Sequence, residues 1–188
     1  MAYTVAVIET LICMKEAVKS LQAEEKGKYT VLAVAVILMA LAGTVLGYKN
    51  GVFDICSIFI LGFMGFAAID DAIYMLIPEI HMMMTLTISM GVIIAKRGIT
   101  VPCIVIIGVM LFCNIIGQLG FADTIYVVCM IAAVACKGTT EIIIMSLWIA
   151  TVALAINIIY NKKNGKGDSA AYMHWMFIAF MIVANTYN

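Results

Sequence analysis

Long apolar runs separated by short polar turns constrain this chain more than any other feature of its sequence. Seven such runs follow one another, at residues 29–47, 52–71, 81–95, 99–116, 124–136, 141–160 and 170–184. A helix needs about 20 predominantly apolar residues to cross the hydrocarbon of a bilayer. The pattern therefore predicts an all-α, polytopic membrane helix bundle with about six to seven transmembrane helices, in which the run at 124–136 is short.

Composition supports this class. The 188 residues are 65% hydrophobic and 12% charged, with a mean hydropathy of +1.12, whereas a soluble domain is roughly 45–50% apolar and 25% charged. A formal net charge of zero suggests no nucleic-acid partner. The six cysteines form no Cys-x-x-Cys pair, and His81 and His174 are isolated in the sequence, so we predict neither a metal site nor a cofactor.

The first 28 residues differ from the rest. Apolar residues recur there at about helical spacing and charged residues crowd the second half, which predicts an amphipathic segment at 1–28 along the membrane surface. A short first span is the alternative. Residues 29–188 then form a single transmembrane domain. If the spans alternate from a cytoplasmic N-terminus, cytoplasmic positions carry the larger share of lysines, as the positive-inside rule requires. We expect a multi-pass protein of the cell membrane.

Three carboxylates lie at the ends of apolar runs. Asp70 and Asp71 end the second run, and Asp123 is the last residue of a turn that contains Gly117 and Gly120. The alternating topology puts Asp71 and Asp123 on the same, cytoplasmic, side. Carboxylates there either mark the water interface or serve a function. Two carboxylates held close share a proton, so that one can accept a proton from water while the other polarises a carbonyl. Glycines at 117 and 120 suit a close approach of the backbone to a substrate or a helix.

Two motifs resemble those of the type IV prepilin peptidases. The first runs from Asp71 to the Ile-Pro pair that ends at Pro78, and the second, Gly120-Phe-Ala-Asp123, is similar to the family's Gly-x-Gly-Asp with Ala122 in place of the second glycine. The resemblance implies a membrane-embedded aspartyl endopeptidase in which Asp71 and Asp123 are the catalytic pair. It would remove the basic leader of prepilin-like precursors after a glycine, at the cytoplasmic face.

The resemblance also sets limits. The cytoplasmic domain with two Cys-x-x-Cys pairs, which larger members carry, is absent, so the chain resembles the short, peptidase-only branch and methyltransferase activity is unsupported. The last run lacks the family's proline. The spacing to Pro78 selects Asp71 rather than Asp70, for which a supporting or interfacial role is expected. The implied partners are a prepilin-like substrate and the lipid bilayer, and the oligomeric state stays open. The alternative function is a non-catalytic membrane transporter or a pilin-binding assembly scaffold.

Overall fold

The structure is a computed structural model that describes residues 30–74, 77, 79–117, 119–135, 140–163 and 172–186. These ranges form seven helices and contain no strand, which confirms the predicted all-α class. The helices are α2 (Thr30–Lys49), α3 (Ile55–Tyr74), α4 (Glu79–Lys96), α5 (Val101–Ile115), α6 (Phe121–Ala133), α7 (Thr140–Lys163) and α8 (Met173–Thr186). The amphipathic segment expected at 1–28 lies outside the described residues.

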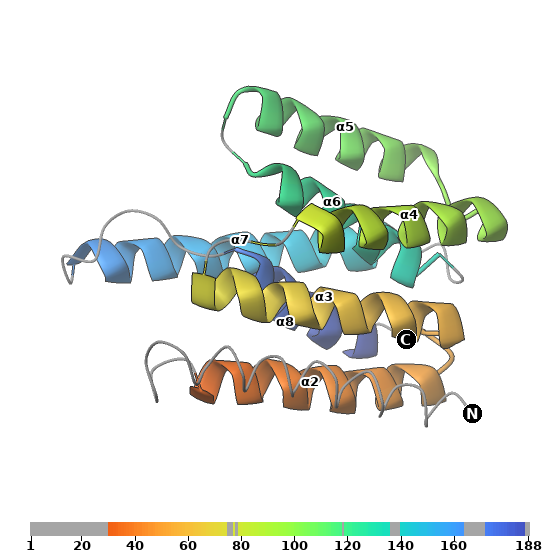
Figure 1. Ribbon diagram of the computed structural model, residues 1–188, viewed down its shortest axis with the longest axis horizontal. Coiled ribbons are helices and arrows are strands. Elements are labelled where there is room, and N and C mark those ends of the chain that lie inside the picture. The colour runs from red at the N-terminus through yellow and green to blue at the C-terminus, as the bar shows by residue number, and fades with distance from the viewer. Residues whose placement is uncertain are drawn as a thin grey trace.

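The helices lie side by side in a bundle, with α5 and α2 on opposite sides of it (Figure 1). Helix α6 is central and contacts α3, α4, α5, α7 and α8. Helix α8 is the second centre of packing and contacts α2, α3, α6 and α7. One end of the bundle therefore brings together the end of α3 and the starts of α4, α6 and α8.

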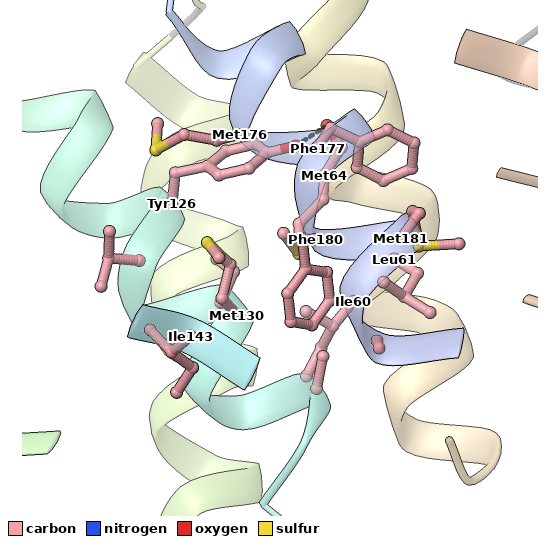
Figure 2. Packing of buried hydrophobic residues seen from close by; sticks show 14 of the residues in the cluster. Ile60, Leu61, Met64, Tyr126, Met130, Ile143, Met176, Phe177, Phe180 and Met181 are labelled. Atoms are coloured by element: carbon pink, nitrogen blue, oxygen red, sulfur yellow. Dashed lines mark hydrogen bonds between the residues drawn. The ribbon is translucent and has the colours of Figure 1, made fainter. Parts of the chain in front are cut away.

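Helix α6 forms the core. Every residue from Thr124 through Ala135 is buried, and the Tyr126 hydroxyl donates to the carbonyl oxygen of Met64 at 3.0 Å, which fixes α6 on α3 (Figure 2). The helix begins at Phe121, after Gly120 in an extended conformation. Asp123 therefore lies in the first turn of α6, and not in the preceding turn where the sequence pattern had placed it.

The opposite end of the bundle is fixed by polar contacts. Asp54 caps α3 by accepting the backbone N–H of Ser57 at 2.8 Å, and it forms an ion pair with Lys96, whose Nζ lies 2.5 Å from Asp54 Oδ2. This pair joins the start of α3 to the end of α4. Gly98 lies against the end of α6, where an added Cβ would fall 2.4 Å from the Cβ of Ala135. Helices α3, α4 and α6 are thus held in register at this end.

Among the described residues, two helices, α4 and α7, are long and apolar enough to cross a membrane. Six to seven were expected. Helices α5, α6 and α8 have 15, 13 and 14 residues, which is shorter than the roughly 20 that a span requires. Large apolar side chains nevertheless lie on the outside of several helices, including Ile94 (70% exposed), Ile115 (82%) and Trp148 (68%).

Candidate functional site

Asp71 lies in the last turn of α3 and reaches across to α8. Its Oδ2 accepts the backbone N–H of Met173, the first residue of α8, at 2.8 Å. The backbone N–H of Tyr172 also donates to this carboxyl group. The first N–H groups of a helix have no partner within the helix and carry a partial positive charge. The start of α8 therefore holds the half-buried carboxyl group of Asp71 in place.

Asp123 is held by its own helix. It is the third residue of α6, and its Oδ2 accepts the backbone N–H of Gly120 at 3.0 Å. Gly120 has a φ of −74°, which any residue adopts, but an added Cβ would lie 3.3 Å from Asp123 Oδ2. A glycine at 120 thus leaves room for the carboxyl group of its own helix, which is a different contact from the approach to a substrate or a neighbouring helix that was expected there.

The two carboxyl groups lie at the same end of the bundle. They come from α3 and α6, which pack against each other, and their charges interact. The hydrogen bond between Tyr126 and Met64 joins the same two helices. Both predicted site residues therefore lie at the end of the bundle where α3 ends and α6 begins, and their common depth in a membrane stays a prediction.

The other residues singled out in the sequence have different positions. Gly117 has a φ of +73° and no atom within 4 Å of an added Cβ, so it serves the turn after α5 and not a close approach of two backbones. Ala122, beside Asp123, lines a pocket. Asp70 is buried and projects about 100° away from Asp71 around α3. Pro78 lies outside the described residues.

Tyr172 is a site residue that the sequence did not single out. Its backbone N–H donates to Asp71, its phenol interacts electrostatically with Asp123, and its hydroxyl lies 3.0 Å from the hydroxyl of Thr151 on α7. Tyr172 therefore connects the two carboxyl groups to a fourth helix. The sequence marks it only as a tyrosine near the start of the last apolar run, which is a common position for tyrosine in membrane proteins.

A small pocket lies at the same end of the bundle as the two carboxyl groups. Its walls come from α3, α4, α6 and the first residue of α8, and most of the side chains are apolar. The lining includes Ala67, Met82, Ala122, Tyr126 and Met173. Ala122 precedes Asp123 in the chain and Met173 donates to Asp71, but neither aspartate is among the residues that line the pocket.

Neither histidine contributes to a metal site in the described part of the chain, where no group of three or more metal-binding side chains is found. His81 lines the pocket, and its ring meets the ring of Phe66 edge to face at a centroid distance of 5.0 Å. His174 is buried beside Trp175. Both occupy the end of the bundle that holds the two aspartates.

No family model, curated protein or solved structure matches the chain. The chemistry of the site is therefore argued from its own residues. Two carboxyl groups with interacting charges, each held by backbone N–H groups, can divide the roles of acid and base between them. They can equally act as caps that join α3 to α8 and start α6.

Proposed function

We propose that this chain is a membrane-embedded aspartyl endopeptidase of the prepilin peptidase type, with Asp71 and Asp123 as its catalytic pair. One observation carries the proposal. Two carboxyl groups that are distant in the sequence lie at one end of the bundle, on helices that pack against each other, and are near enough for their charges to interact. Capping of two helix starts explains each carboxyl group by itself, but it does not require the two like charges to lie near each other, which lowers stability; a function accounts for their nearness.

The proposed reaction is hydrolysis of a peptide bond. The ionised member of the pair takes a proton from water, and the water oxygen attacks the carbonyl carbon of the scissile bond. The protonated member donates a hydrogen bond to the carbonyl oxygen as negative charge develops on it. The proton taken from water then passes to the leaving nitrogen as the carbon–nitrogen bond breaks. The first carboxyl group is thereby ionised again, and the second is still protonated. The reaction needs no group beyond the pair and a water molecule.

The site is proposed to lie at the cytoplasmic face of a bilayer. Helices α4 and α7 are long and apolar enough to span it, and exposed apolar side chains such as Ile94, Trp148 and Ile159 suit contact with lipid. In the multi-pass arrangement of six to seven spans proposed from the apolar runs, the excess of lysines places the N-terminus in the cytoplasm. The ends of α3 and of the loop before α6 then face the same compartment.

The proposed substrate is inferred from the two sequence motifs. The aspartate followed by Ile-Pro, and the Gly120-x-x-Asp123 sequence, favour a prepilin-like precursor that is cut after a glycine behind a basic leader. The rival function is a non-catalytic transporter or scaffold. The hydrogen bonds of both carboxyl groups to helix N-termini favour the scaffold among these rivals, because capping alone would account for the two aspartates.

A cleavage assay distinguishes the proposal from this rival. The purified protein, in lipid, is incubated with a precursor that carries a basic leader, a glycine and an apolar helix, and the products are identified by mass spectrometry. We expect a single cut after the glycine and none when a bulky residue replaces that glycine. The Asp123→Asn variant is the matched control. A cut by Asp123→Asn at the wild-type rate, or no cut by the wild-type protein, would contradict the proposal.

A further inference from the structure

We infer that Thr151 and Tyr172 are positioning residues for the proposed catalytic pair. The hydrogen bond between their hydroxyl groups anchors the start of α8 to α7, and the start of α8 in turn orients the carboxyl group of Asp71. The inference rests on the proposed function and adds to it a dependence of the pair on α7, a helix that carries neither aspartate.

The direction of this hydrogen bond follows from the hydrogen atoms that are free to make it. A threonine hydroxyl has one hydrogen, and Thr151 donates it to the carbonyl oxygen of Leu147, one turn earlier on α7, at 2.7 Å. Tyr172 is therefore the donor to Thr151 Oγ1, at 3.0 Å. Its hydroxyl has no second hydrogen to donate to a carboxylate. Tyr172 thus acts on Asp71 through its backbone and not through its phenol.

The backbone of Tyr172 connects this anchor to Asp71. Tyr172 directly precedes α8, and its carbonyl oxygen accepts the N–H of Met176 at 3.1 Å. Its own N–H donates to the Asp71 carboxyl group, as does the N–H of Met173 at 2.8 Å. Helix ends fray, and a misplacement of about 1 Å can slow catalysis about a hundredfold. A side-chain bond that fixes the start of α8 therefore also fixes the orientation of Asp71.

Removal of the acceptor on α7 tests the inference. Thr151 is exposed, so Thr151→Val removes the hydroxyl and leaves no cavity. Thr87→Val is the matched control, because Thr87 is exposed on α4 and likewise donates to the carbonyl oxygen one turn earlier, at 2.8 Å.

Cleavage is measured where every variant is fully folded. Thr151→Val should lower kcat at least about tenfold with little change in KM, since neither positioning residue is proposed to touch the substrate. Thr151→Ser, which keeps the acceptor, and Thr87→Val should both cut at the wild-type rate. A wild-type kcat for Thr151→Val, or an equal loss in Thr87→Val, would overturn the inference.

Amide hydrogen exchange tests the anchor without cleavage. The N–H groups of Tyr172 and Met173 should exchange at least about tenfold faster in Thr151→Val than in the wild-type protein or Thr87→Val, because the start of α8 opens more often. If the wild-type protein cuts the precursor and Thr151→Val changes neither the exchange nor kcat, the inference fails and the proposed function stands. If exchange rises in Thr151→Val and the wild-type protein does not cut, the proposed function fails and the anchor of α8 stands.

Discussion

Asparagine and alanine at position 71 should separate catalysis from helix capping. The Asp71 carboxylate accepts N–H groups from Tyr172 and Met173 at the start of α8. The amide oxygen of asparagine can accept the same hydrogen bonds, and asparagine is as good a helix cap as aspartate. Alanine cannot accept them. Neither replacement can take a proton from water.

The magnitudes follow from these contacts. Asp71→Ala leaves N–H groups of α8 without their acceptor, which costs about 1–3 kcal/mol of unfolding free energy. Asp71→Asn should cost less than about 1 kcal/mol, because the acceptor remains and the repulsion with Asp123 is removed. Both variants should lose cleavage by at least about 10³-fold, since groups that act as a unit fail together. Asp71→Asn with Asp123→Asn should then be little worse than either change alone.

Stability and cleavage are measured on the same preparations. Unfolding is followed by SDS titration in mixed micelles, and cleavage by the appearance of the shortened precursor. If Asp71→Asn keeps more than a tenth of the wild-type rate, Asp71 does not activate water. If it is destabilised as much as Asp71→Ala and cuts in proportion to the folded fraction, the carboxylate is a cap and the catalytic interpretation is wrong.

Three further predictions concern the surroundings of the pair. Asp70→Asn should retain cleavage because its side chain projects from another face of α3, and a cleavage rate near that of Asp71→Asn would show that the register is off by one residue. Tyr172→Phe removes the hydrogen bond to Thr151 and should lower the free energy of unfolding by about 0.5–1.5 kcal/mol. Adding Thr151→Val to this variant should cause no further loss, because the bond is already gone. Additive losses in this double-mutant cycle would contradict a direct bond. The topology is tested with single cysteines in a variant that lacks the native cysteines. Cysteines placed in residues 161–168 should react with an impermeant thiol reagent from the cytoplasmic side, and those placed in residues 96–98 should react from the outside. The reverse pattern would overturn the topology.

The sequence predicts the helices and marks Asp71 and Asp123 as candidate site residues. Apolar runs predict helices that pack in a bundle. A carboxylate at the end of such a run is easily identified because its neighbours are apolar. The predicted bounds of the helices were less accurate. The apolar run was expected to begin at residue 124, but α6 begins at Phe121, directly after Gly120, so that Asp123 lies in its first turn and not in a loop. Local sequence gives little information on whether a glycine ends a turn or caps a helix.

Contacts between helices that are distant in the sequence could not be predicted from it. The bond from Asp71 to the start of α8 uses backbone N–H groups, which every residue except proline carries, so no side-chain pattern announces it. The burial of α6 from Thr124 onward could not be predicted either, because the sequence of an apolar helix is similar whether protein or lipid surrounds it. The number of spans depends on the same distinction, and α5, α6 and α8 are too short for length alone to decide it.

The bond between Asp71 and Met173 has a consequence for biogenesis. Helix α3 leaves the ribosome about a hundred residues before α8, so Asp71 and Asp123 can both be in place while the N–H groups that orient Asp71 do not yet exist. If the pair is catalytic, the nascent chain carries an incomplete active site until its last described helix has docked. Activity would then switch on only at the end of assembly, and a half-made copy in the membrane would leave neighbouring proteins uncut.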